Sequence, residues 1–168
     1  MSLNIRREQQ SDIQHIETVT IAAFKNAQYS AHNEQYIVNA LRCNGALSVS
    51  LVAEHDGVVI GHVAVSPVTI AGNNENWFGL GPISVVPSEQ GKGVGTLLMN
   101  AAIDALKTLK ANGCVLLGEP AYYSRFGFSP INGLTLPGVP AEYFQALHLQ
   151  GTIPQGDVVY NDAFSARK

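Results

Sequence analysis

Apolar residues along this chain return at helical spacing in some stretches and as short apolar runs in others. Residues 13–24 show the helical pattern, and Ser11-Asp12 offers N-cap side chains directly before them. A second short helix is expected over residues 34–41, and Asn44-Gly45 would end it. With a strand candidate at residues 3–6, these patterns predict a strand followed by two helices at the start of the chain.

The longest helical pattern covers residues 94–110 and gathers apolar residues on one face. Asn112-Gly113 is the expected stop, because both residue types end helices readily. A one-sided helix of this kind is expected to pack on a sheet. The apolar face consists of Val94, Leu97, Leu98, Ala101, Ala105 and Leu109.

Two β-rich segments, residues 47–54 and 58–66, are joined around Asp56-Gly57. This dipeptide is typical of a hairpin, since both central positions of a type I′ turn take positive φ. We therefore expect neighbouring antiparallel strands. A polar turn at residues 72–76 follows, and then a strand at residues 77–86.

The apolar run at residues 114–117 has no polar alternation, as expected of a strand covered on both faces. Because a helix joins it to the strand at 77–86, the two should run parallel. The pattern predicts an α+β fold in which antiparallel strands and one parallel pair share a sheet. Weaker strand candidates should finish that sheet, at residues 134–136, 143–149 and 158–160.

Composition indicates one compact domain spanning residues 1–168. The chain has 168 residues, enough to bury a sizeable core without disulfides or metals. Charged residues make up 14% and hydrophobic residues 46%, which favours a globular protein over a disordered one. Cys43 and Cys114 are the two cysteines, so a disulfide framework is not expected.

The charge balance bears on the class of partner. A net charge of -3 without a cluster of Lys or Arg gives nucleic-acid phosphates little to bind, whereas a cationic amine substrate is compatible. The start of the sequence lacks the apolar core of a signal peptide, and no apolar stretch reaches membrane-spanning length. We expect a cytoplasmic protein with neither nucleic-acid nor membrane partners.

A glycine-rich segment, residues 90–96, lies between the strand at 77–86 and the long helix. Gly91, Gly93 and Gly95 let the backbone turn sharply with its N–H groups pointing inward. The following helix adds unpaired N–H groups and the positive end of its dipole. The segment therefore predicts a cradle for a pyrophosphate.

Two better-known phosphate loops fit this segment badly. A nucleotide P-loop needs Gly-Lys followed by Ser or Thr, but Gly91-Lys92 is followed by Gly93. A dinucleotide loop needs an acidic residue about 20 positions further on, where this chain has 111–114, Ala-Asn-Gly-Cys. A nucleotide-dependent kinase or dehydrogenase is therefore disfavoured.

The segment is similar to the acyl-CoA signature of the GNAT acetyltransferase superfamily, Gln/Arg-x-x-Gly-x-Gly/Ala after a strand ending in Val-x-Pro. Gln90, Gly93 and Gly95 match it. A second element, Tyr123 four residues before Gly127-Phe128, resembles the family's Tyr-x-x-x-Gly-Phe ending. Within the superfamily the chain looks most like small single-domain bacterial N-acetyltransferases whose substrates are largely unassigned.

The resemblance implies a GNAT-like fold, with a mixed, mostly antiparallel twisted sheet and helices on both faces. Its central parallel strands would splay apart to admit acetyl-CoA as co-substrate. Main-chain groups of Ile83, Ser84 and Val85 would pair with the pantetheine arm. The alternative is that the glycines only form a tight turn. The residues expected to form the pyrophosphate site and its surroundings are Gln90, Gly91, Lys92, Gly93, Val94, Gly95 and Thr96.

The resemblance places Tyr123 beside the thioester, where a phenol can protonate the departing sulfur. Tyr122 is the neighbouring alternative, and both rings could simply pack the short helix at 121–126. Arg125 reads as a solvated or ion-paired residue. Phe126 is most simply a core residue.

No motif identifies a general base. Glu119 follows the strand at 114–117, at the end where ligands gather in open α/β sheets, but it could also be a solvated loop residue. His62 lies within a predicted strand, where a structural role is common. Cys114 in its apolar run reads as an inert buried thiol. The five histidines lack the spacing of metal sites, so no metal is expected.

The sequence thus predicts an acetyltransferase that passes the acetyl group of acetyl-CoA to a primary amine by direct attack. The alternative is a non-catalytic acyl-CoA-binding module of the same fold. Residues 20–45 and the C-terminal segment should select the acceptor, and aminoglycosides, polyamines, amino acids, peptides and protein N-termini all stay open. Homodimers are common in the family, so a homodimer is compatible with the sequence.

Overall fold

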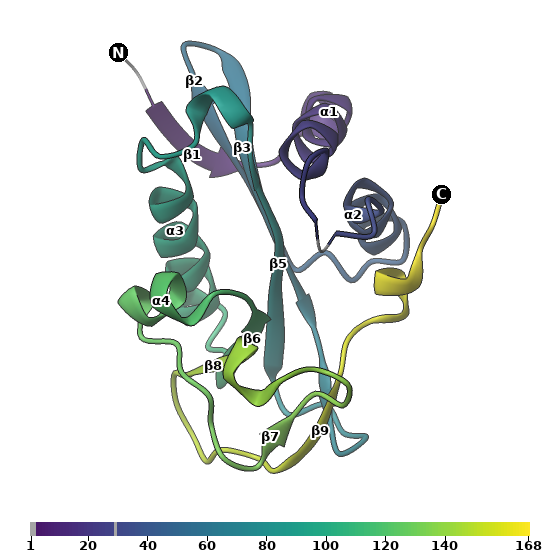
Figure 1. Ribbon diagram of the computed structural model, residues 1–168, viewed down its shortest axis with the longest axis vertical. Coiled ribbons are helices and arrows are strands. Elements are labelled where there is room, and N and C mark those ends of the chain that lie inside the picture. Colours follow the sequence, from purple (N-terminus) through teal and green to yellow (C-terminus); the bar gives the residue numbers. More distant parts are fainter. Residues whose placement is uncertain (1–2, 29) are drawn as a thin grey trace.

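The computed structural model describes residues 3–28 and 30–168. Its main sheet has six strands in the order β1-β2-β3-β5-β6-β8, and only the neighbours β5 and β6 run parallel (Figure 1). This confirms the predicted mixed, mostly antiparallel sheet. In chain order its strands are β1 (Leu3–Arg7), β2 (Val49–His55), β3 (Val58–Pro67), β5 (Trp77–Val85), β6 (Gly113–Leu117) and β8 (Phe144–His148).

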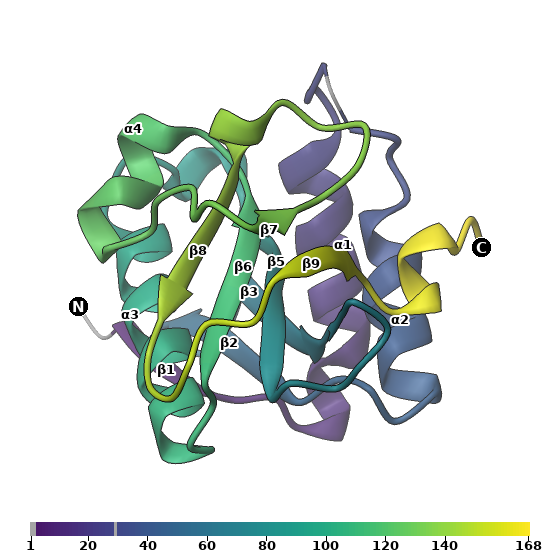
Figure 2. The ribbon, with the colours of Figure 1, turned by 90° about the horizontal axis from the view of Figure 1, so that it is seen from below.

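Helices cover both faces of this sheet, as predicted. In Figures 1 and 2, α1 and α2 lie on one side, while α3 and the short α4 lie on the other. The C-terminal turn at residues 162–165 packs against α2. The helices are α1 (Ile13–Phe24), α2 (Glu34–Cys43), α3 (Val94–Thr108) and α4 (Pro120–Tyr123).

The start of α1 differs from the prediction. The chain begins to turn earlier, in a 3-10 turn at Gln10–Asp12, and the Asp12 carboxylate accepts a hydrogen bond from the Gln9 N–H at 2.7 Å. Asp12 is the N-cap residue of α1, as predicted, but its side chain makes no capping hydrogen bond to this helix. The Asp12 carboxylate instead binds the Arg6 guanidinium, with Nη1 2.7 Å from Oδ2.

The buried face of α3 also differs from the predicted stripe. Leu97 and Leu109 are 44% and 47% exposed. Several rows of apolar residues run along this helix, and their spacing alone does not tell which row meets the sheet. The residues that α3 buries are Val94, Leu98, Met99, Ala102, Ile103 and Leu106.

The end of α3 lies before the predicted stop. Lys110 takes a left-handed conformation with φ 58°, and its N–H donates to the Lys107 carbonyl. Gly113 already belongs to β6, where a Cβ would come within 2.4 Å of the Trp77 indole. Gly113 is therefore required for packing rather than for ending the helix.

The hairpin at Asp56-Gly57 is confirmed, with φ values of 50° and 83° between the antiparallel strands β2 and β3. The later strands only partly follow the prediction. β8 completes the main sheet beside β6, but the segments expected at 134–136 and 158–160 form a separate small sheet. In Figure 1, β7 and β9 lie at the lower end of the molecule, and in Figure 2, which is seen from below, they face the reader. The strands of this small sheet are β4 (Thr69–Ile70), β9 (Gly156–Val159) and β7 (Leu134–Thr135).

The parallel pair β5–β6 separates as the resemblance implied. Pairing runs only from Trp77 with Gly113 to Gly79 with Val115, whereas β5 continues to Val85. On its other edge β5 is bulged, because Gly81 and Pro82 together oppose the single residue Ala64 of β3. Beyond Gly79, β5 therefore has no strand partner on its β6 side among the described residues.

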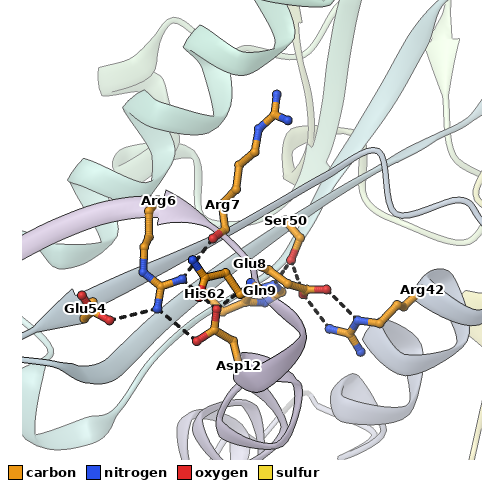
Figure 3. Close-up of polar contacts among 9 residues, drawn as sticks. All are labelled: Arg6, Arg7, Glu8, Gln9, Asp12, Arg42, Ser50, Glu54 and His62. Carbon is orange, nitrogen blue, oxygen red and sulfur yellow. Dashed lines mark hydrogen bonds and ion pairs between the residues drawn. The ribbon is translucent and has the colours of Figure 1, made fainter.

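A network of charged and polar side chains joins β1 to its neighbours (Figure 3). Arg6 binds both Asp12 and Glu54, and the hydrogen bonding between Arg6 and Asp12 holds the pKa of the Asp12 carboxyl below its ordinary value. Glu8 accepts two hydrogen bonds from Arg42 of α2, at 2.7 and 2.8 Å. These contacts fasten α1 and α2 to the sheet next to the strands that carry the site.

Candidate active site

The segment after β5 forms a closed loop that leads directly into α3. The Gln90 side chain donates from Nε2 to the Val85 carbonyl at 2.9 Å, which ties the loop to the end of the strand. Gly91 and Gly93 have φ values of 76° and 87°, a region that favours glycine. Gly93 is the N-cap of α3, so the unpaired N–H groups of the first helical turn follow it.

A pocket of about 410 Å³ opens beside this loop, and we call it the cradle pocket. It combines the glycines of the loop with the splayed part of β5 and with aromatic residues of α4. Ser84, Lys92 and Val94, which were expected near the pyrophosphate or pantetheine, do not line it. The residues that do are Ile83, Val85, Gln90, Gly91, Gly93, Gly95, Thr96, Tyr122, Tyr123 and Arg125.

The three expected residues outside the lining have other surroundings. The Ser84 and Val94 side chains are buried, so only their main-chain groups could serve a ligand. The Lys92 side chain is 62% exposed, and its ammonium lies 3.8 Å from Glu89 Oε2.

Tyr122 and Arg125 give the cradle pocket a second wall. The Arg125 guanidinium lies 4.4 Å from the centre of the Tyr122 ring, a cation–π contact. The Tyr122 hydroxyl lies 3.1 Å from the position that a Cβ on Gly95 would take. The sequence analysis assigned Arg125 no function, although Arg125 lies within the Tyr-x-x-x-Gly-Phe element that the resemblance places beside the thioester.

Tyr123 lies between the cradle pocket and a second pocket, and it lines both. Its ring packs against the backbone of Gly118 and makes an edge contact with Tyr122, the ring centroids being 4.9 Å apart. Burial, and secondarily the neighbouring Tyr122, raise the pKa of the Tyr123 phenol. The phenol is therefore protonated at neutral pH and can donate a proton.

The second pocket has a volume of about 480 Å³, and we call it the apolar pocket. It contains side chains from the end of α1, from α2 and from the C-terminal segment, the regions expected to select the acceptor. It shares Ile83 and Tyr123 with the cradle pocket. Its lining consists of Phe24, Glu34, Ile37, Leu80, Gly81, Pro82, Ile83, Leu116, Leu117, Tyr123, Tyr160 and Phe164.

Glu34 is a functional candidate that sequence reasoning missed. It is the first residue of α2, and both of its carboxylate oxygens lie within hydrogen-bond distance of Ser30 Oγ, at 2.6 and 2.8 Å. Only its location in residues 20–45 pointed to it. Tyr160 and Phe164 pack edge to face with ring centroids 4.9 Å apart, and burial raises the pKa of the Tyr160 phenol.

The remaining predicted candidates lie outside both pockets. Glu119 is exposed at the N-cap of α4, where its carbonyl accepts from the N–H groups of Tyr122 and Tyr123. Cys114 is fully buried, and burial raises the pKa of its thiol.

His62 is buried on the α1 side of the sheet, in the network of Figure 3. Ser50 Oγ donates to Glu8 Oε1 at 2.6 Å and lies 2.8 Å from His62 Nε2. Because the Ser50 hydrogen is used on Glu8, we assign the imidazole proton to Nε2, which donates to Ser50. Burial lowers the pKa of His62 to about 4, so the ring is neutral.

Residues 3–28 and 30–168 contain no group of three or more His, Cys, Asp or Glu side chains that could hold a metal ion. None of the described helices has both the length and the apolar character that crossing a membrane requires.

Comparisons with known proteins agree with this geometry. The family model described as an acetyltransferase (GNAT) domain matches residues 46–130. Over 114 residues the chain is 38% identical to the uncharacterized N-acetyltransferase YhbS of Escherichia coli K12, covering 67% of this chain and 68% of that protein. It is 31% identical to the uncharacterized N-acetyltransferase YjhQ of the same strain, covering 79% and 70% of the two chains.

Solved structures show the same fold. A GNAT family acetyltransferase from Brucella melitensis, crystallised with acetyl-CoA, has a TM-score of 0.88 and 46% identity, covering 97% of this chain and 98% of that one. Escherichia coli YhbS, crystallised with CoA, has a TM-score of 0.84 and 33% identity, covering 97% and 92%.

The splayed sheet with its glycine cradle is that of an acyltransferase, and the chain belongs to the GNAT acetyltransferase family. This confirms the resemblance found in the sequence and the predicted enzyme class. The residue assignments within the site stay predictions.

Proposed function

We propose that the protein transfers the acetyl group of acetyl-CoA to a primary amine by direct attack of the amine. One observation carries this proposal: the cradle pocket and the apolar pocket share Ile83 and Tyr123. A thioester at this shared wall would face a nucleophile in the apolar pocket. Acetyl-CoA supplies the activated acyl group.

The chain's own residues fit such a co-substrate. Backbone N–H groups from Gly91 to Thr96 would hold its diphosphate at the start of α3, and the Arg125 cation adds charge to the same pocket. The edge of β5 that β6 leaves free would pair with the pantetheine amides at Ile83–Val85. The acetyl-CoA in the Brucella relative, 46% identical to this chain, supports this assignment.

Two residues carry the chemical step in this proposal. The amine nitrogen bonds to the thioester carbon, the carbon–sulfur bond breaks, and the Tyr123 phenol gives its proton to the leaving thiolate. The proton that the amine loses passes to the Glu34 carboxylate, directly or through water. Glu34 takes the role for which the sequence suggested Glu119, because Glu34 lines the apolar pocket. Cys114 lines neither pocket, which favours direct attack over an acyl-enzyme.

The test measures thiol release by the purified protein from acetyl-CoA with a panel of amines. Tyr123→Phe should lower kcat by about 10²-fold and leave the acetyl-CoA Kd unchanged. Tyr143→Phe is the matched control, because Tyr143 is exposed and lines neither pocket. A loss in Tyr122→Phe instead would move the acid role to Tyr122. Saturable acetyl-CoA binding without thiol release on any amine would indicate the non-catalytic binding module.

A further inference from the structure

The apolar pocket has an uneven chemical character. Phe24, Ile37, Leu80, Leu116 and Phe164 supply aromatic and aliphatic wall, and Glu34 is the only formally charged residue among the described residues that line it. Of the residues that the structure describes, no Lys, Arg or His belongs to this lining. A ligand carboxylate or phosphate would therefore lose its water without gaining a cationic partner, which is costly.

Glu34 is held ready to accept a cation. Ser30 Oγ lies 2.6 and 2.8 Å from its two oxygens, and a single hydroxyl hydrogen leaves most of the carboxylate lone pairs free. Its position at the first residue of α2 places the charge where the helix dipole favours an anion. One ammonium group can therefore bind here through charge-assisted hydrogen bonds.

Tyr160 gives the pocket a fixed aromatic surface. Its ring lies against β5 at Gly79, where a Cβ would come within 2.7 Å of Tyr160 Cε2, and it packs edge to face with the Phe164 ring. Burial raises the pKa of its phenol, so no second negative charge arises here at neutral pH. Because these contacts fix the ring, Tyr160 presents a rigid apolar surface to a ligand.

The two pockets have opposite charge character. The cradle pocket offers N–H groups and the Arg125 guanidinium, which suit an anion, whereas the apolar pocket offers one carboxylate and apolar walls. Ile83 and Tyr123 separate them. The electrostatics therefore direct an anionic ligand to one side of this wall and a cationic one to the other.

On the basis of the function proposed above, we infer that the acceptor is a hydrophobic primary amine, an aliphatic or aromatic body carrying one amino group and no carboxylate beside it. A volume of about 480 Å³ suits a small molecule of this kind. Polyamines and aminoglycosides would place several polar groups against apolar walls, and free amino acids would bring an unpaired carboxylate.

Matched pairs of amines test the inference. 2-Phenylethylamine differs from phenylalanine by the carboxylate alone, and hexylamine differs from 1,5-diaminopentane by a methyl group in place of the second ammonium. We expect kcat/KM to be at least about tenfold higher for the first member of each pair, since an unpaired charge in an apolar site costs more than 1.4 kcal/mol. Equal or reversed preference would overturn the inference and leave the proposed acetyl transfer intact. Absence of acetylation for every amine, with acetyl-CoA bound, would overturn both.

A variant links the preference to its residue. Glu34→Gln should raise KM for 2-phenylethylamine by about tenfold or more through loss of a charged hydrogen bond, and it should lower kcat because the amine loses its proton acceptor, while the acetyl-CoA Kd stays unchanged. Glu142→Gln is the matched control, since Glu142 is exposed and lines neither pocket. An unchanged KM in folded Glu34→Gln would contradict the assignment of the carboxylate to the amine.

Discussion

The ring of Tyr123 lies where a side chain on Gly118 would be: a Cβ at Gly118 would come within 2.2 Å of Tyr123 Cε2. Gly118 is itself held, because its N–H donates to the Tyr143 carbonyl and its own carbonyl accepts from Gln145 Nε2, both at 3.0 Å. The backbone therefore has little freedom to retreat. The position of the phenol between the two pockets therefore requires glycine, which has no side chain, at residue 118.

Gly118→Ala should displace the Tyr123 ring without touching the glycine cradle. We expect kcat to fall by about tenfold or more, because a small displacement of an acid from the leaving sulfur is costly. The acetyl-CoA Kd should change by less than about threefold, and overpacking should lower the free energy of unfolding by about 1–3 kcal/mol. Steady-state kinetics, calorimetry and urea unfolding measure the three quantities.

Combining this change with Tyr123→Phe supplies the control. If Gly118 acts through the phenol, the double variant should be scarcely slower than Tyr123→Phe alone. Full activity in Gly118→Ala would show that the position of the ring does not matter.

Gly93 and Gly138 form a matched pair for testing the cradle. Both have positive φ, at 87° and 85°, and a Cβ on either would meet nothing within 4 Å. Because alanine is strained at positive φ, each substitution should lower the free energy of unfolding by a similar amount, about 1–2 kcal/mol. Only Gly93→Ala should also weaken acetyl-CoA binding, by about tenfold or more, since only Gly93 orients the N–H groups at the start of α3.

Calorimetric titration of the two variants measures this difference directly. Equal acetyl-CoA affinity in Gly93→Ala and Gly138→Ala would show that the loop conformation does not hold the ligand.

The buried His62 should make stability depend on pH. Its pKa in the folded protein is about 4, below the ordinary 6.5, so below pH 6.5 the unfolded chain binds a proton that the folded protein does not. Stability is then lost as pH falls from about 6.5 towards 4, at up to about 1.4 kcal/mol per pH unit. Glu8 and Asp12, whose pKa values are lowered, add further loss only below their ordinary values of 4.5 and 3.8.

Urea unfolding at several pH values between 6.5 and 4.5 isolates the contribution of His62. His62→Gln should weaken the dependence of the free energy of unfolding on pH in this range, whereas His15→Gln, at an exposed position of α1, should leave this dependence unchanged. If His62→Gln keeps the full pH dependence of the free energy of unfolding, another group takes up the proton.

The cradle was predictable because its signals are local. Gly91 and Gly93 encode the turn through their own backbone freedom, Gln90 reaches the end of the strand five residues earlier, and α3 begins directly afterwards. The parallel pairing of β5 and β6 followed from the helix that joins them. A short segment therefore carried most of the information about the family.

The apolar pocket was not predictable in the same way. The pocket brings Phe24 and Glu34 together with two aromatic residues more than a hundred positions later in the chain, Tyr160 and Phe164. No pattern of spacing in the sequence predicts that such distant residues line one pocket. The face that α3 buries was misjudged for a related reason, since Leu97 and Leu98 have equal apolar character and only the sheet chooses between them. Long-range packing decides both features.

A crystal structure of the protein grown with CoA tests the central claim most directly. We expect the diphosphate on the N–H groups between Gly91 and Thr96, and the sulfur within hydrogen-bond distance of the Tyr123 hydroxyl, facing the apolar pocket. Diphosphate bound away from this loop, or a sulfur that ends outside the wall of Ile83 and Tyr123, would contradict the account.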